Sequence, residues 1–311
     1  MPDREREEAL EALAASDAAD VLGADVRISR ALAGGGGRAV WELEAARGRF
    51  IARIVNARDL DGLKREQRLG EFLSCLPVEV PRLTLHEAPH GLAISLHRKI
   101  EGEPFDPETF ARRFSARDRE AFVSDVADLL SRLHAIPLED ACRCLELDPL
   151  TRHEAAGLFG CARWFDAARI EELLADVLSA DPQLDSLWQD TRSWLDAYSV
   201  DPDDMLFGHG DLHGGNMAVL ETSDGFRLNG VFDLQIGGIV HLYDEFLRIR
   251  LLDAAVGQKI VEAYNGLPGQ TRTVNGVPLD HFYRAFLFYL LHQSTNESYS
   301  ARLLSMLSTD P

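Results

Sequence analysis

Five segments within the first hundred residues alternate between apolar and polar positions with the two-residue period of β-strands. Between the third and fourth strand-like segments, leucines and phenylalanines recur at helical spacing over residues 59–76. A second amphipathic helix is predicted over residues 4–22. The pattern therefore predicts a five-stranded sheet with two helices. The predicted strands are residues 26–33, 39–45, 49–55, 82–88 and 91–100.

From about residue 107 the pattern becomes mainly helical, beginning with a helix predicted at 118–135. The whole order predicts an α+β fold with a β-rich N-terminal lobe over residues 1–99 and a larger helical C-terminal lobe over residues 100–311. Further helices are predicted at 162–179, 184–199, 240–265 and 279–306. Short strands are predicted at 205–209, 217–221 and 226–233.

Charge and composition narrow the classes of function. The 311 residues carry a net charge of −19, which repels nucleic acid and favours either a cationic partner or simple solubility. The sequence contains no run of about 18 apolar residues, so no membrane span is expected. The N-terminus is acidic and lacks the basic start of a signal peptide, so we expect a cytoplasmic protein.

The segment FGHGDLHGGNMAV, residues 207–219, concentrates the candidate chemistry. Its loop carries Asp211 and Asn216, and the next predicted strand ends at Asp233. Two acids and an amide at the ends of adjacent strands supply the oxygen ligands that Mg²⁺ prefers. This set also leaves one carboxylate, Asp211, to accept a proton or orient a hydroxyl.

The motif HGDLHGGN, followed by a strand, a turn and Phe-Asp, resembles the catalytic and metal-binding loops of the aminoglycoside phosphotransferase and choline kinase superfamily. The resemblance runs from about residue 26 to about residue 255 and implies a bilobal protein-kinase-like fold. It implies that Asp211 is the catalytic base or hydroxyl-orienting residue, and that Asn216 and Asp233 hold magnesium. His209 is expected to brace the loop. Asp244, which opens the helix after the metal-binding segment, is expected to cap that helix or support the loop rather than to contact the substrate.

The same resemblance implies a nucleotide site in the N-terminal lobe. Residues Gly34, Gly35, Gly36 and Gly37 would let backbone N–H groups approach phosphates, although a flexible turn explains them equally well. Family members commonly place a lysine on the third strand, held by a helix glutamate; here Arg53 and Glu66 occupy these positions. Adenine would contact the backbone of residues 96–99. Leu234 and Gln235 depart from the family pattern.

The expected activity is therefore transfer of the γ-phosphoryl group of ATP (or GTP), with Mg²⁺, to a hydroxyl of a small molecule. An aminoglycoside-type antibiotic is the favoured acceptor, which implies a role in antibiotic resistance. The alternative acceptors are choline, homoserine, methylthioribose, fructosamines and macrolides. Two other classes of protein stay open. One is a protein kinase, for which no HRD, DFG or APE motif is found, and the other is a non-catalytic nucleotide-binding module. Four acids are expected either to line a cationic-substrate site or to lie on the solvated surface: Asp201, Asp203, Asp204 and Glu245.

Overall fold

The chain forms two compact units, each built from several separate stretches of sequence. The computed structural model describes residues 14–16, 18–22, 25–32, 39–56, 59–88, 91–106, 110, 115–159, 167–223, 225–294 and 296–309. The first unit comprises Met1–Phe122, Cys144–Glu146 and Gly215–Gly237. The second comprises Val123–Arg143, Leu147–Gly214 and Gly238–Pro311. The predicted lobe boundary after residue 99 stays a prediction.

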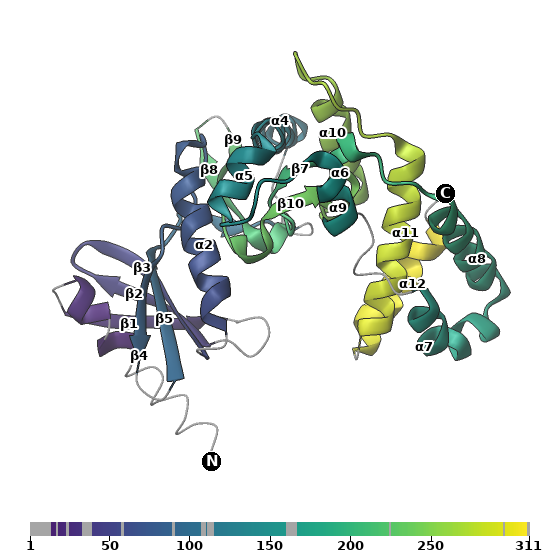
Figure 1. Cartoon of the computed structure of the whole chain (residues 1–311). Helices are drawn as coiled ribbons and strands as arrows, with labels where there is room; N and C mark the ends of the chain where they lie inside the picture. The colour runs from purple at the N-terminus through teal and green to yellow at the C-terminus, as the bar shows by residue number, and fades with distance from the viewer. Residues whose placement is uncertain are drawn as a thin grey trace. The chain divides into compact units, whose positions relative to one another are not determined.

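A five-stranded antiparallel sheet dominates the first unit (Figure 1). Its order is β1-β2-β3-β5-β4, so the two hairpins β1–β2 and β4–β5 flank the central β3. All five predicted strands are confirmed within one or two residues at most ends. They are β1 (Val26–Leu32), β2 (Ala39–Ala45), β3 (Gly48–Asn56), β4 (Thr84–Ala88) and β5 (Leu92–Arg98).

Alternation along β3 decides what each face of this sheet carries. Ala52 and Ile54 join a core that includes Trp41 and the N-terminal residue Ala18. Arg53 and Val55 point to the opposite face because successive strand side chains alternate. There the predicted helix forms α2 (Leu60–Phe72), which ends in the short 3₁₀ turn Leu73–Cys75 and packs Leu63 against Val55. Arg53 therefore lies on the helix-covered face.

A second, smaller sheet of the first unit has the order β6-β8-β9. The backbone N–H of Glu79 donates to Asn229 O at 2.7 Å, and the N–H of Val231 donates to Glu79 O at 3.0 Å. These bonds tie the segment after α2 to β9. The strands are β6 (Glu103–Pro104), β8 (Met217–Thr222) and β9 (Gly225–Val231), and a 3₁₀ turn over Leu234–Ile236 follows β9.

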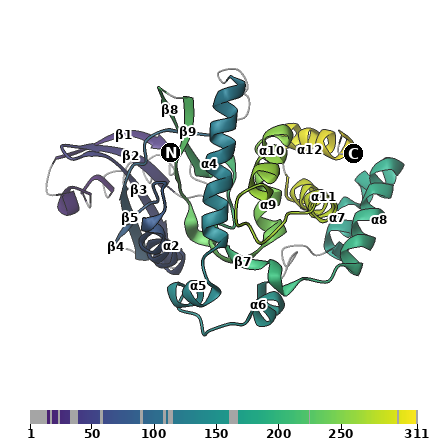
Figure 2. The same ribbon diagram turned by 90° about the horizontal axis from the view of Figure 1, so that it is seen from above.

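The second unit is mainly helical. At its centre α11 packs beside α7, α8, α9 and α12, with Trp188 and Phe288 in a T-shaped contact at 5.0 Å (Figures 1 and 2). Two short antiparallel strands, β7 (Met205–Gly208) and β10 (Gly238–His241), lead into the candidate site. The helices are α4 (Ala116–His134, which begins in the first unit), α5 (Leu138–Cys144), α6 (Arg152–Phe159), α7 (Ala167–Ala180), α8 (Pro182–Ala197), α9 (Leu242–Arg250), α10 (Ala254–Asn265), α11 (Gly276–Gln293) and α12 (Glu297–Thr309).

Two predicted helices of this unit are wrong as single elements. The stretch 240–265 starts in β10 and then forms α9 and α10, which are separate because the Asp253 carboxylate caps α10 by accepting the N–H groups of Ala255 and Val256. The stretch 279–306 divides into α11 and α12 around Ser294. Within the described ranges, no helix has both the length and the apolar character needed to cross a membrane.

Candidate functional site

The cation predicted on the third strand makes the contacts that define one half of the site. Arg53 forms an ion pair through Nη2 with the Glu66 carboxylate of α2. Its Nε donates to Ser95 Oγ at 3.4 Å, and its Nη1 lies 3.9 Å from Asp233 Oδ1. The side chains of Arg53 and Glu66 are only 12% and 2% exposed, respectively. The first unit therefore brings together three of the predicted site residues; their roles toward a nucleotide stay predictions.

Glu66 lies in a buried environment that disfavours its charged form, and Arg53 opposes this effect. Burial raises the pKa of Glu66, and the nearby Asp233 charge raises it further. The charge and hydrogen bond of Arg53 act in the opposite direction, as does a hydrogen bond with the Gln235 side chain. Gln235, which departs from the family pattern, thus supports the glutamate that holds Arg53.

Arg65, the residue before Glu66, anchors α2 to the loop that follows Asp233. Its Nε and Nη2 donate to Gly237 O at 3.2 and 2.7 Å. Burial lowers the pKa of Arg65, and the neighbouring Arg68 lowers it further. No sequence pattern marks Arg65, because nothing in the order of residues reveals a carbonyl acceptor 172 positions away.

The two predicted magnesium ligands lie at the same end of the β8–β9 hairpin. The Phe232 N–H donates to Asn216 O at 3.0 Å, which sets the residue before Asp233 against Asn216. Asp233 has φ 60° and ψ 58°, a left-handed conformation that aspartate tolerates better than most residues. Asn216 is buried, and Asp233 is partly exposed. One amide and one carboxylate fit Mg²⁺, which is usually held by one or two carboxylates together with substrate phosphates.

The loop that carries Asp211 belongs to the second unit and is braced from beneath by Glu245 of α9. The Glu245 carboxylate accepts the backbone N–H groups of His209 at 2.9 Å and Gly210 at 2.7 Å. Gly210 has φ 76°, which a glycine adopts without strain. Glu245 is fully buried, so the expectation that it is a surface acid or a substrate contact is wrong. Its partners are backbone groups, which a sequence pattern does not identify.

Asp211 itself has polar neighbours on both carboxylate oxygens. Arg248 Nη1 lies 2.7 Å from Oδ1, and His213 Nε2 lies 3.8 Å from Oδ2. The Asp211 N–H donates to the Nδ1 of the buried His209 at 3.3 Å. The Arg248 guanidinium also lies over the Phe286 ring, 5.0 Å from its centroid. Arg248 was missed because no motif marks it, although it lies on the helix that also supplies Glu245.

His241 caps α9, a role expected for Asp244. The His241 Nδ1 accepts the N–H of Tyr243 at 3.3 Å, while Asp244 lies within the first turn. Burial lowers the pKa of His241 to about 4, which keeps the ring neutral and able to accept this bond near neutral pH. The N-cap of α9 is therefore His241 and not Asp244, whereas support of the loop by Asp244 stays a prediction.

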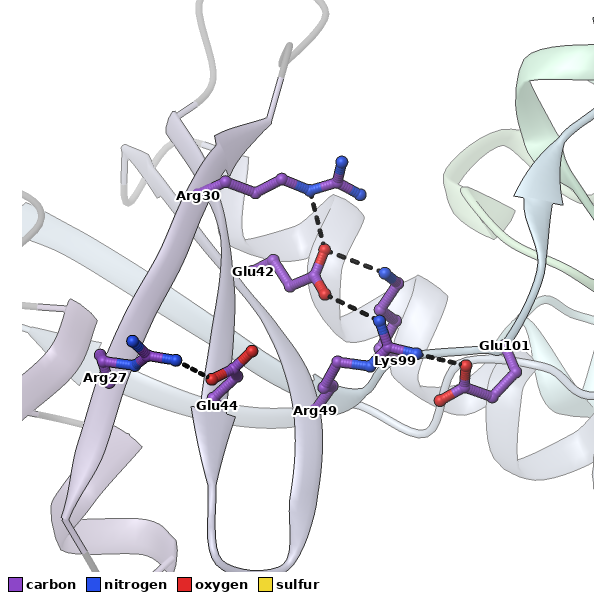
Figure 3. A network of polar contacts seen from close by, with 7 residues as sticks. All are labelled: Arg27, Arg30, Glu42, Glu44, Arg49, Lys99 and Glu101. Carbon is purple, nitrogen blue, oxygen red and sulfur yellow. Dashed lines mark hydrogen bonds and ion pairs between the residues drawn. The ribbon is translucent and has the colours of Figure 1, made fainter.

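A separate ionic cluster lies on the same face of the five-stranded sheet as Arg53. The Glu42 side chain, 4% exposed, accepts from Lys99 Nζ and Arg30 Nε at 2.9 Å each, and lies 3.5 Å from Arg49 Nη1 (Figure 3). Burial by itself raises the pKa of Glu42, but Lys99 and Arg30 lower it below its ordinary value. Lys99 lies in the segment whose backbone is expected to contact adenine, and its side chain pairs with Glu42 of β2. Arg27–Glu44 and Arg49–Glu101 pairs flank the cluster.

From the burial of Glu245 we expect the free energy of unfolding to depend on pH. Burial raises its pKa to about 7, against hydrogen bonds from Gly210 and His209 that lower it. The stability contributed by the protonated side chain is fully present below pH 4.5 and is lost as the pH rises through about 7, a change of about 3 kcal/mol. Glu245→Gln, which resembles the protonated acid, should lack this loss. Denaturant unfolding of both proteins from pH 5 to 8 measures it, and parallel pH profiles would contradict it.

The remaining predicted nucleotide contacts, Gly34 to Gly37, lie outside the described residues. The described candidate residues are therefore divided between the two units. Arg53, Glu66, Asn216 and Asp233 belong to the first unit, and Asp211 belongs to the second. Asp211 precedes Asn216 by five positions in the chain.

Comparisons with known proteins identify the family of the chain and its fold. A sequence model described as "Phosphotransferase enzyme family" matches residues 29–273. No curated protein matches the chain by sequence. Similar solved structures include the GDP complex of wild-type aminoglycoside 2'-phosphotransferase-IIIa, at 17% identity and a TM-score of 0.63, with 91% of this chain and 93% of that chain covered.

Two further structures widen the range of acceptors among the similar proteins. One is the ternary complex of streptomycin, ATP and APH(2")-IIa, at 14% identity and a TM-score of 0.57, with 94% of each chain covered. The other is the macrolide 2'-phosphotransferase MphH from Brachybacterium faecium, at 16% identity and a TM-score of 0.59, with 97% of this chain and 99% of that chain covered. These likenesses show an α+β, protein-kinase-like fold, which confirms the predicted fold class.

Proposed function

The chain belongs to the phosphotransferase enzyme family, and from this premise we propose that it transfers the γ-phosphoryl group of ATP or GTP to a hydroxyl of a small molecule. The observation that carries the proposal is the buried Arg53–Glu66 ion pair beside Asp233. It supports the proposal because a cation that could bind phosphate, the acid that fixes it and a carboxylate that could bind a metal ion lie close together.

Arg53 would bind the α- and β-phosphates through its planar guanidinium, which grips phosphate oxygens in a bidentate manner. Glu66 and Ser95 hold this side chain in place. Asn216 and Asp233 would hold Mg²⁺ against the phosphates. When bound, the ion would neutralise the charge that develops on the phosphoryl group. The backbone of Gly34 to Gly37, which lie between β1 and β2 in the sequence, would approach the phosphates.

Asp211 would orient the acceptor hydroxyl and accept its proton as transfer proceeds. His209 and Glu245 position the loop through backbone hydrogen bonds rather than through chemistry of their own. Because positioning and electrostatics supply most of the acceleration of phosphoryl transfer, a rigid loop is what the reaction requires.

The reaction would take place in the cytoplasm. The thiols of Cys75, Cys142 and Cys144 are free, which supports a reducing compartment. An aminoglycoside-type antibiotic remains one candidate acceptor, supported by the streptomycin complex of a similar protein and by the net charge of −19. A macrolide or a small metabolite is the alternative.

Turnover with and without metal tests the proposal. The full chain should transfer the label of γ-labelled ATP or GTP to at least one member of a panel of hydroxyl compounds when Mg²⁺ is present. Chelation of the metal should stop the transfer, and addition of Mg²⁺ should restore it. The variant Asp203→Ala, which removes an acid whose side chain is 87% exposed, should keep full activity under the same conditions. Absence of metal-dependent transfer or hydrolysis would sink the proposal.

A further inference from the structure

We propose that Arg248 selects the acceptor by charge, so that the hydroxyl that meets Asp211 belongs to a compound carrying an acidic group rather than ammonium groups beside that hydroxyl. This inference rests on the proposed function and concerns the acceptor side of the same site. It departs from the aminoglycoside expectation, which was based on net charge and on resemblance. Its basis is the direct contact of Arg248 Nη1 with Asp211 Oδ1 at 2.7 Å.

The position of Arg248 brings its charge close to any acceptor. A hydroxyl oriented by Asp211 lies within about 3 Å of that carboxylate. The guanidinium contacts the same carboxylate, so the groups next to the hydroxyl lie within about 6 Å of it. An ammonium group there would compete with Arg248 for Asp211 and would meet a like charge. A carboxylate or phosphate there would find a cationic donor.

A second contact holds the guanidinium in place. Phe286 lies against it, with the ring centroid 5.0 Å from Cζ, within the range of a cation–π interaction. The ion pair with Asp211 is made through one nitrogen, Nη1, of a group with five N–H donors. The side chain is 24% exposed, as is that of Asp211, so both remain accessible to a small molecule. His213, 3.8 Å from the other oxygen of Asp211, adds a further nitrogen rather than an acid.

The four acids that could have lined a site for a cationic acceptor have other neighbours. Asp201 accepts the backbone N–H of Asp203 at 2.9 Å, and Asp203 lies 3.4 Å from Arg152 Nη1. Glu245 is fully buried and bonded to the loop backbone. Asp204 lies 3.9 Å from Nε2 of the neutral His241 ring, a distance too long for a hydrogen bond. The described residues thus place an arginine, and none of these four acids, in direct contact with the carboxylate that receives the hydroxyl.

Acceptors of equal carbon-chain length that differ in charge test the role of Arg248 directly. The panel consists of hydroxy acids, diols and amino alcohols of three to six carbons, such as 4-hydroxybutyrate, 1,4-butanediol and 4-amino-1-butanol, together with streptomycin and kanamycin. We expect kcat/KM to fall in the order anion, neutral compound, cation. A charge-assisted hydrogen bond from Arg248 should favour the anion over the neutral compound by about ten- to a hundred-fold.

Arg248→Gln should reduce the preference for the anion at least tenfold through KM and kcat/KM, while nucleotide binding is kept. Arg250→Gln is the matched control. Arg250 lies on the same helix, pairs with Asp280 and stacks over Tyr283 at 4.6 Å, so its loss removes an equivalent ion pair away from Asp211. This control should keep the preference of the native protein. A change of preference that both variants share would indicate a merely structural role and overturn the inference.

The outcomes separate this inference from the proposed function. Faster transfer to the cationic acceptors, an unchanged preference in Arg248→Gln, or no transfer to any anionic acceptor would overturn the role of Arg248. In each of these cases, Asp211-dependent transfer to another acceptor, or Asp211-dependent hydrolysis of ATP, leaves the phosphotransferase proposal standing. Loss of both with every compound would overturn the proposed function itself.

Discussion

Replacement of Asp211 by Asn is expected to lower kcat by about 10²- to 10⁴-fold while nucleotide affinity stays within about twofold. The amide keeps the size of the side chain, and the backbone N–H that donates to His209 is unchanged. It cannot accept the hydroxyl proton, and it loses the charge that pairs with Arg248. The residues proposed to hold the nucleotide belong to the first unit and are not altered.

The measurement is steady-state turnover together with equilibrium binding of ATP or GTP and the thermal midpoint. Asp203→Asn serves as the control for removing one negative charge from the same unit, since Asp203 is exposed and pairs with Arg152 at 3.4 Å. It should retain full turnover. Near-native kcat in Asp211→Asn would show that another group receives the proton. Equal loss of activity in both variants would point to a general effect of charge.

Replacement of Arg53 by Met is expected to lower the free energy of unfolding by about 3–5 kcal/mol and to abolish nucleotide binding. The reason is that Glu66, with a side chain 2% exposed, would be left as a buried carboxylate without its ion-pair partner. Burial already raises the pKa of Glu66. The double variant Arg53→Met, Glu66→Leu should recover most of the stability, because an apolar pair fills the site without an unpaired charge. It should recover none of the binding.

A second ion pair of the same sheet provides the comparison. Arg27 and Glu44 join β1 to β2 with side chains 77% and 42% exposed. Because solvent screens such a pair, Arg27→Met should cost less than about 1 kcal/mol and leave nucleotide binding intact. Denaturant unfolding and nucleotide titration of the four proteins measure both effects. If Arg53→Met costs no more than Arg27→Met, the buried pair has no special role in stability.

Much of the first unit could be predicted because its strands have one buried face. In β3 the order Ala52, Arg53, Ile54 places the arginine opposite the two core residues, and the same alternation is visible in the sequence. The helix that follows repeats its leucines at helical spacing, so Glu66 could be placed on it before its contact was known. Local periodicity contains this information because it follows from backbone geometry alone.

The second unit was less predictable where one apolar run serves two elements. Val240 was predicted to start a helix, but it pairs with Leu206 in β7, and its neighbour Ile239 pairs with Phe207. The apolar pattern of residues 240–265 suits either structure, and only the availability of β7 as a partner decides in favour of a strand. The end of α9 likewise depends on the cap that Asp253 supplies to the next helix.

The sequence by itself determined the family, the fold class and the identity of the candidate chemical groups, because motif spacing and periodicity are properties of neighbouring residues. Only the tertiary structure decided what holds those groups and what surrounds them. Glu245 accepts the loop N–H groups from 35 and 36 positions away, and Arg248 meets Asp211 from a different element. Such contacts depend on how helices and strands pack, and packing acts between residues whose separation along the chain carries no pattern.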